Sequence, residues 1–408
     1  MSLNCYRKFG RMPALSLLLS LACSSGAALL PPMLDLPGVG TATEEIDFKT
    51  FPELDGRHGL VNRGESPWLF RLHSYLAFYD GKYWCMWSHG PVVEDKPTQH
   101  VRYATSVDGL HWSQDDFIAT PPAGKGERYI SRGFWQRNGK LIALATLDGR
   151  LPRHNTPWSS DLELLGFEWD PKNAEWKKPI VIFPDTLSNF PPEKVANGQW
   201  LMMRRDHKRS VSVLFGGVKS LSDWEVVPAV KYKLKNSNFQ AEEPDWWELP
   251  DGRLMGVYRD NSNSTRLHRA ISTDMGHSWS KPEKTNFPDA TSKFFGMKIS
   301  LGFYILVSNA NPITNANPLG RNPLCLATSD DGITFTRMAR LPIPVAPEGG
   351  PFDAEHTSGT LQYPHVLEKD GQLLISYSRH KTVIETVKIS LTEIERLRDG
   401  KLPARPLN

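Results

Sequence analysis

Cysteine is scarce in this 408-residue sequence, which contains four, and only Cys85 and Cys325 lie well inside the chain. Their spacing does not define a disulfide, so two buried free thiols are expected. Paired cysteines and a helical His-x-x-x-His pattern are missing, as are a glycine-rich phosphate loop and a serine nucleophile elbow. These absences argue against metal, phosphate-loop and serine-hydrolase chemistry, and we expect no cofactor.

An excess of charge of either sign is also missing. The 48 Lys+Arg residues are balanced by 45 Asp+Glu residues, which leaves a net charge of +3 and no basic tract. A dedicated nucleic-acid binder needs a concentrated basic surface, so nucleic acid is not an expected partner. No apolar run is long enough for a transmembrane helix, because the stretch Ala14–Ala22 has only nine residues.

The amino-terminal residues 1–28 have the pattern of an export signal. A basic start precedes Ala14–Ala22, and small residues follow at positions 24–28. Residues 19–23 (LSLAC) resemble a bacterial lipobox, although Ser20 stands where an aliphatic residue is usual, so Cys23 is a candidate site for a lipid anchor. We expect residues 29–408 to form a single domain that is monomeric and secreted or periplasmic, with or without that anchor.

Turn-forming residues and tryptophan are plentiful, with 32 Pro, 31 Gly and 13 Trp. Six times, a short apolar strand leads through a tight turn into a second apolar strand, and most of these turns read Asp-Gly or Asn-Gly. The turn glycines are Gly81, Gly139, Gly198, Gly252, Gly302 and Gly371. Their spacings are 58, 59, 54, 50 and 69 residues, and no helical pattern appears before Leu391–Leu397. This repeat predicts an all-β fold, a six-bladed β-propeller with one four-stranded sheet per unit.

A second repeat has the form of an Asp-box. It occurs at residues 106–112 (SVDGLHW), 272–279 (STDMGHSW) and 329–335 (SDDGITF). In such a turn the Ser and Asp side chains bond backbone amides, the glycine takes a positive φ, and the aromatic residue packs beneath the loop. The aspartates Asp108, Asp274 and Asp331 are therefore interpreted as turn residues and not as catalytic ones.

A propeller usually binds its ligand near the central axis, where the innermost strand of each blade can present a side chain. The order of polar residues on these strands resembles that of the sialidase (neuraminidase) superfamily, over residues 65–395. The matching positions are Arg71 in Arg-Leu-His, Asp95 before the first Asp-box, Glu243-Pro244 before the fourth hairpin, Arg259 after it, Arg321, and Tyr363 before the last hairpin. Asp-boxes are shared by many other proteins, but this ordered set is more specific.

The resemblance implies an acidic glycan as substrate. The guanidinium groups of Arg71, Arg259 and Arg321 would converge on the carboxylate of a terminal sugar and hold it through bidentate, charge-assisted hydrogen bonds. His73 and His100 are further candidates for substrate contact, because both belong to the first repeat unit.

The resemblance also implies roles for three catalytic residues in an exo-acting, retaining glycosidase. Tyr363 would attack the anomeric carbon, Glu243 would take its proton, and Asp95 would protonate the leaving oxygen. A neutral tyrosine suits this task because it is not repelled by the carboxylate of the sugar. The adjacent Glu242 could take the role of Glu243, and the adjacent Glu94 could take the role of Asp95.

Histidine favours an alternative hypothesis. His73 replaces the proline that usually ends the first motif, and His100 lies in the same unit. These histidines resemble those of propeller enzymes that act on rhamnose–glucuronic acid linkages, where His and Tyr serve as base and acid and Arg neutralises a uronate. The alternative is thus a polysaccharide lyase or an atypical glycosidase, and a second alternative is a glycan-binding propeller without catalysis.

Overall fold

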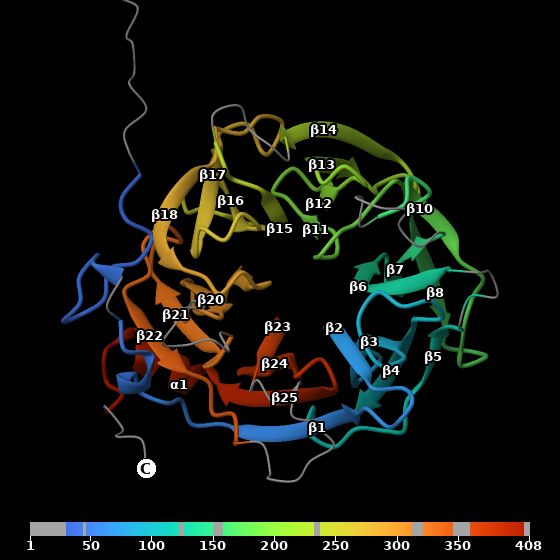
Figure 1. The fold of residues 1–408 in the computed structure, drawn as a ribbon, viewed down its shortest axis with the longest axis horizontal. Helices are drawn as coiled ribbons and strands as arrows, with labels where there is room; N and C mark the ends of the chain where they lie inside the picture. Colours follow the sequence, from blue (N-terminus) through green and yellow to red (C-terminus); the bar gives the residue numbers. More distant parts are fainter. Residues whose placement is uncertain are drawn as a thin grey trace, which may run out of the picture. The chain divides into compact units, whose positions relative to one another are not determined.

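The computed structural model describes residues 30–43, 46–120, 122, 126–149, 158–231, 237–311, 321–345 and 360–403. Residues 32–408 form one compact unit, and its described residues build six antiparallel sheets that are arranged as a ring (Figure 1). The predicted six-bladed, all-β propeller is therefore confirmed. The predicted export signal and Cys23 lie outside the described residues.

Five sheets consist of strands that follow one another along the chain, from the centre outwards. The first contains β2 (Phe70–Tyr79), β3 (Lys82–Gly90), β4 (His100–Ser106) and β5 (Asp116–Ala119). The second contains β6 (Arg128–Arg137), β7 (Lys140–Asp148), β8 (Glu163–Asp170), β10 (Ile180–Pro184) and the short β9 (Glu175–Trp176), which pairs with β8. The third contains β11 (Glu193–Lys194), β12 (Trp200–Arg205), β13 (Val211–Gly216) and β14 (Trp224–Val230). The fourth contains β15 (Ala241–Glu248), β16 (Leu254–Asp260), β17 (Arg266–Ser272) and β18 (Glu283–Pro288). The fifth contains β19 (Phe295–Lys298), β20 (Tyr304–Ser308), β21 (Cys325–Ser329) and β22 (Arg337–Arg340).

The sixth sheet joins the two ends of the propeller. It contains β23 (Leu361–Lys369), β24 (Gln372–Arg379) and β25 (Val383–Ser390), and its outermost strand is β1 (Arg57–Arg63), which pairs with β25. This pairing ties the start of the ring to its end and closes the propeller. A 3-10 turn, η2 (Phe48–Thr50), precedes β1, and α1 (Leu391–Arg398) follows β25. Among the described helices, none has the length and apolar character needed to cross a membrane.

The predicted turns have the expected geometry. The six hairpin glycines all have a positive φ, between 71° and 89°. At the first Asp-box, the Gly109 amide donates to Ser106 Oγ at 2.8 Å, the Leu110 amide donates to Asp108 Oδ1 at 2.9 Å, and Trp112 Nε1 donates to the Gly109 carbonyl at 3.1 Å. The interpretation of this aspartate as a turn residue is confirmed, and the other two boxes bond in the same way.

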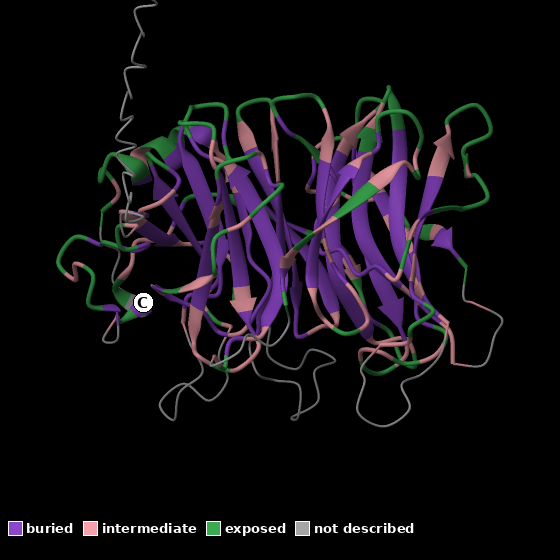
Figure 2. Cartoon of the chain, turned by 90° about the horizontal axis from the view of Figure 1, so that it is seen from above, coloured by how far each residue is buried: buried purple, intermediate pink, exposed green. Residues whose placement is uncertain are grey.

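The core lies between the blades, and the connecting loops carry most of the exposed residues (Figure 2). Cys85 and Cys325 are buried free thiols, as predicted. The sheets thus form a rigid frame that holds the innermost strands close to one another around the axis.

Candidate active site

Three innermost strands, β2, β15 and β23, carry the same irregularity. In each, two residues lie opposite a single residue of the neighbouring strand, which is a β-bulge. The first bulge residues are His73, Glu243 and Tyr363, with φ values of 55°, 43° and 59°. Because a non-glycine residue at positive φ costs about 1–3 kcal/mol, the surrounding sheet must hold these conformations in place. Bulges of this kind re-aim side chains, and here they bring three residues together from separate blades.

Tyr363 and Glu243 meet at the centre of the site. Tyr363 Oη donates a hydrogen bond of 2.5 Å to Glu243 Oε1, across 120 residues of sequence. Arg259 Nη1 donates to Glu243 Oε2 at 2.8 Å and lies 3.4 Å from Tyr363 Oη. Both Tyr363, at 7% exposed, and Glu243, at 4%, are buried. The structure therefore brings together three of the residues that the sequence predicted.

Glu243 and Tyr363 are held in opposite protonation states. Burial alone would raise the pKa of the Glu243 carboxyl, but the charges of Arg259 and Arg205 lower it to about 2. Burial, together with the adjacent Glu243 charge, raises the pKa of the Tyr363 hydroxyl above its ordinary value. The resting pair is thus a carboxylate that accepts a hydrogen bond from a neutral phenol.

Arg321 lies beside this pair. It donates to the side chain of Gln362, the residue before Tyr363, and its Nη2 donates to the Thr291 carbonyl at 2.7 Å. Its charge lowers the pKa of the Tyr363 hydroxyl, against the larger effect of burial. The buried Asp289 interacts electrostatically with both Arg259 and Arg321, which places the two arginines on the same side of the site.

Arg71 does not join this cluster, contrary to the expected convergence of three arginines. Its Nε donates to Asn62 Oδ1 at 2.6 Å, and its Nη1 donates to the carbonyls of Trp68 at 2.7 Å and Phe70 at 3.0 Å. The reason is its position two residues before the bulge. The same position holds the buried Ala241 and Leu361 in β15 and β23, so it faces the core of the propeller wall.

His100 also lies in the wall of the first blade. It is 1% exposed, and its ring lies 5.2 Å from Trp68 and 4.6 Å from His89 between ring centroids. Arg102 Nε donates to His100 Nε2 at 3.2 Å, and burial lowers the pKa of His100 to about 4. The structure thus places His100 in a buried aromatic stack, apart from Tyr363.

His73, in contrast, stands against the tyrosine. Its ring meets that of Tyr363 edge to face, with 5.0 Å between the centroids. Its Nδ1 lies 3.1 Å from Ser88 Oγ and its Nε2 lies 3.6 Å from Glu94 Oε1. Burial lowers the pKa of His73 to about 3, so the imidazole is neutral and one ring nitrogen can accept a hydrogen bond.

Asp95 lies on the loop between β3 and β4. It has a φ of 66°, and its side chain is 41% exposed. Arg128 Nη1 lies 3.3 Å from Asp95 Oδ1, and Arg128 is itself paired with the buried Asp148 at 2.7 Å. Its partial burial, and next the charge of Glu94, raise the pKa of Asp95 to about 6. Arg132 interacts electrostatically with both Asp95 and Tyr363, so the loop faces the same site.

Two further arginines, Arg132 and Arg205, were not predicted. Arg132 is 1% exposed, and its Nε donates to Thr146 Oγ1 at 3.1 Å. Arg205 pairs with Glu242, and its Nη2 donates to Asn189 Oδ1 at 3.1 Å. The two adjacent glutamates therefore have different partners. Glu242 pairs with Arg205, whereas Glu243 accepts the hydrogen bond from Tyr363.

A positional signal could have found Arg132. It stands at a bulge in β6, just before Gly133 with its φ of 105°, as the predicted residues stand at the bulges of their own strands. Each bulge residue lies seven to nine positions before its hairpin glycine. The pairs are His73 and Gly81, Arg132 and Gly139, Glu243 and Gly252, and Tyr363 and Gly371. Within the described ranges, no group of three or more His, Cys, Asp or Glu side chains is placed to hold a metal ion.

The fold and the Tyr363–Glu243 pair define a sialidase-like β-propeller. The chain belongs to the family described as BNR repeat-like domain, whose model matches residues 81–375. Among solved structures, it is similar to the NanB sialidase of Streptococcus pneumoniae, with a TM-score of 0.60 and 11% identity over 84% of this chain and 71% of that one. It is also similar to the Trypanosoma rangeli sialidase in complex with sialic acid, with a TM-score of 0.58 and 16% identity over 85% and 61% of the two chains.

Two other similarities extend this comparison. A protein of unknown function from Dyadobacter fermentans has a TM-score of 0.60 and 14% identity, over 82% of this chain and 98% of that one. The sucrose-6-phosphate hydrolase of Escherichia coli is 24% identical over 186 residues, which are 43% of this chain and 38% of that protein. The chain thus matches less than half the length of this curated relative. The similarities to solved structures, at 11–16% identity, show a shared fold.

Proposed function

We propose that this protein is an exported exo-glycosidase of the sialidase type, which removes a terminal acidic sugar from glycans with retention of configuration. The observation that carries the proposal is the 2.5 Å hydrogen bond from Tyr363 to Glu243, with Arg259 on the other carboxylate oxygen. A phenol beside a buried carboxylate, bordered by arginines, is suited to attack a sugar that carries its own negative charge.

Arg259 and Arg321 are the proposed ligands of the sugar carboxylate. Both lie beside Tyr363, and a planar guanidinium can bind a carboxylate through two parallel hydrogen bonds. The buried Arg132 supplies further positive charge in place of Arg71, whose donors are used within the wall. An acidic sugar would therefore be favoured over a neutral one at this site.

Substrate binding would also strengthen the base. In the resting site the charge of Arg259 helps to keep the pKa of Glu243 at about 2, which makes it a weak base. When a substrate carboxylate shares the donors of Arg259, part of this stabilisation is lost and the pKa of Glu243 rises. The carboxylate then accepts the phenol proton more readily as Tyr363 Oη forms a bond to the anomeric carbon.

Asp95 is the proposed general acid. It lies on a loop at the site, and its pKa of about 6 means that the carboxyl group carries a proton in mildly acidic solution. In the first step it would donate this proton to the leaving oxygen. In the second step it would accept a proton from the water that attacks the anomeric carbon, while Tyr363 leaves and takes its proton back from Glu243.

A second candidate function rests on His73. Its neutral ring stands 5.0 Å from the Tyr363 ring and 3.6 Å from Glu94, so a histidine–tyrosine pair is present in the same place. In a polysaccharide lyase, one member of such a pair would remove the proton next to a uronate carboxylate and the other would protonate the leaving oxygen. We leave His100 out of this scheme, because it is 1% exposed and packs against His89 in the wall of the first blade.

The product distinguishes the two candidates. Incubation of the protein with sialosides and with rhamnosyl-glucuronate glycans, followed by mass spectrometry, is expected to show a free acidic sugar with the mass of water added. A product that absorbs ultraviolet light through a new conjugated double bond, and to which no water has been added, would show elimination and would favour the lyase. Saturable glycan binding without any product would favour a binding protein.

The pH profile tests the role of Asp95. We expect kcat/KM to fall above about pH 6, because the group must be protonated and its folded-state pKa is about 6. Asp95→Ala should remove this decline and lower kcat by about 10²- to 10⁴-fold on natural glycans, with a much smaller loss on aryl glycosides whose leaving group needs no proton. Asp116→Asn, an exposed change on β5, is the matched control and should keep the decline. A decline that persists in Asp95→Ala would assign the acid to another group.

A further inference from the structure

Arg128, the first residue of β6, holds the loop that carries Asp95 in the neighbouring blade. Its Nη1 donates to the backbone carbonyl of Asp95 at 2.7 Å and lies 3.3 Å from Asp95 Oδ1. The Asp95 amide donates to Gln99 Oε1 at 3.2 Å. Because Asp95 has a φ of 66°, in the left-handed region that a residue other than glycine rarely adopts, its backbone must be held from outside. Arg128 and Gln99 supply the two bonds that hold it.

Asp148 takes the other donors of this guanidinium. It is the last residue of β7 and lies opposite Arg128 in the sheet. Its Oδ2 accepts from Arg128 Nε at 3.0 Å and from Nη2 at 2.7 Å, and both side chains are buried, at 0% and 1% exposed. Trp158 covers the guanidinium, with 4.8 Å from its ring centroid to Arg128 Cζ. The guanidinium is therefore held in one orientation.

This division of donors leaves the carboxyl group of Asp95 only weakly held. An arginine grips a carboxylate most tightly through two parallel hydrogen bonds, and such a grip keeps the carboxylate ionised. Here Nε and Nη2 are used by Asp148, and the short bond of Nη1 goes to the backbone of Asp95. The remaining contact of 3.3 Å with Oδ1 is longer than the usual limit of about 3.2 Å for such a bond. Arg128 thus fixes the backbone and leaves the acid able to carry a proton.

Four charged groups act on Asp95, from its own loop, from β6 and from the turn after β24. Partial burial has the largest effect on the pKa of Asp95 and raises it, and the charge of Glu94 raises it further. The charges of Arg128, Lys381 and Arg132 lower it, and the balance is a pKa of about 6. Glu94 is itself paired with Lys381, so Arg128 faces Asp95 as a separate charge.

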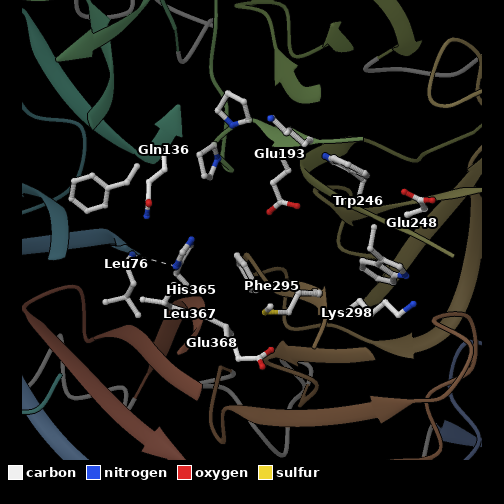
Figure 3. Close-up of a pocket in the computed structure, with 18 of the residues that line it drawn as sticks. Leu76, Gln136, Glu193, Trp246, Glu248, Phe295, Lys298, His365, Leu367 and Glu368 are labelled. Atoms are coloured by element: carbon white, nitrogen blue, oxygen red, sulfur yellow. Dashed lines mark hydrogen bonds between the residues drawn. The ribbon is translucent and has the colours of Figure 1, made fainter. Parts of the chain in front are cut away.

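Other carboxylates near the axis lie too far away to share in this balance. Glu193, Glu248 and Glu368 line a pocket of about 880 Å³ at the other end of the innermost strands (Figure 3). Gln136 of β6 belongs to the same lining, and it lies about 25 Å along the strand from Arg128, at about 3.3 Å per residue. This separation exceeds the roughly 8 Å over which physiological salt screens charges. The pH dependence of Asp95 is therefore set at its own end of the propeller.

We propose that Arg128, oriented by Asp148, is a positioning residue for Asp95: it fixes the backbone that carries the acid and leaves the carboxyl group free to hold a proton. The inference rests on the proposed function, in which Asp95 is the general acid. It assigns a role in that function to a buried ion pair in the wall between the first and second blades.

The first test is Asp148→Asn, which keeps the shape of the side chain and removes its charge. Arg128 then acts on Asp95 without a compensating negative charge. Because a nearby positive charge favours the ionised carboxylate, the pKa of Asp95 should fall. The decline of kcat/KM with pH should therefore move to lower pH, by about 0.5–1 unit.

Arg128→Met combined with Asp148→Asn should shift the decline in the opposite direction. This double variant removes both charges and leaves no buried carboxylate unpaired. Asp95 loses the positive charge at 3.3 Å, so its pKa should rise and the decline should move to higher pH, by about 0.5–1 unit. The loop also loses its anchor, so kcat should fall by about tenfold or more with little change in KM.

Glu385→Gln is the matched control, because it changes an acid to an amide in another buried arginine pair, that of Arg379 and Glu385 at 2.9 Å. It should lower stability in urea unfolding and leave the pH of the decline unchanged. A loss of stability without a pH shift in Asp148→Asn, or shifts in the same direction in both Asp148 variants, would reduce Arg128 to a structural role and overturn the inference.

A titration without substrate separates this inference from the proposed function. Carbon-13 NMR of the whole protein, labelled at the aspartate carboxyl carbons, follows Asp95 directly, with Asp95→Asn to identify its signal. The pKa of Asp95 should fall in Asp148→Asn and rise in the double variant. If these shifts occur in a protein that cleaves no acidic glycan, the proposed function is wrong and the control of Asp95 by Arg128 stands. If the pKa is unchanged in both variants, the inference is wrong whatever the activity.

Discussion

Tyr363→Phe is expected to lower kcat on the acidic glycan substrate by at least about three orders of magnitude, with little change in substrate affinity. The substitution removes the oxygen that would attack the anomeric carbon and leaves the ring in place. The lost hydrogen bond to Glu243 is not essential for folding, because Arg259 still pairs with that carboxylate at 2.8 Å. Steady-state kinetics on the substrate found by the glycan screen, with circular dichroism as a check on folding, would measure the effect.

Tyr258→Phe is the matched control for this variant. Tyr258 is fully buried on β16, beside Arg259, and its hydroxyl has no hydrogen-bond partner in the described part of the chain. The same loss of one oxygen should therefore leave kcat within about twofold of the native value. If Tyr363→Phe kept full activity, a tyrosine nucleophile and the His73–Tyr363 pair of the lyase would both be excluded, and neither candidate mechanism at this site would stand.

The fold could be predicted because its signals are local. Asp80-Gly81 and Asn138-Gly139 specify tight turns from two adjacent residues, and each Asp-box is complete within eight positions. The closing strand β1 could not be predicted in this way. Its sequence, RHGLVNR, has little alternation of apolar and polar residues, and its partner β25 lies more than 300 residues further along the chain. Such a pairing depends on the assembled ring and leaves little trace in the sequence.

Part of the site could also be predicted from local motifs. Glu243, Arg259 and Tyr363 were found from the order of short motifs, and the structure brings their side chains together. Arg71 was expected beside them because its Arg-Leu-His motif resembles the first arginine motif of the sialidase superfamily. The bulge at His73 changes which residue of that strand faces the axis, and in the sequence only the spacing to the hairpin glycine marks such a bulge.

Glu243→Gln is the second change with a large expected effect, and its neighbour provides the control. Glutamine cannot take the proton of Tyr363, so kcat should fall by about 10²- to 10⁴-fold. The change also leaves Arg259 without its charged partner, and breaking a buried ion pair costs about 3–5 kcal/mol of folding free energy. Stability alone could thus be mistaken for the cause of lost activity.

Glu242→Gln separates these two effects. It removes the carboxylate with which the buried Arg205 pairs, so we expect a loss of stability in urea unfolding here too. Because Glu242 faces Arg205 and not the Tyr363 hydroxyl, its kcat should stay within about tenfold of the native value when both variants are assayed at a temperature where they are folded. Equal losses of kcat in the two variants would mean that Glu243 acts through structure alone. A loss confined to Glu243→Gln would identify it as the base, since the two residues differ in which side chain each one faces.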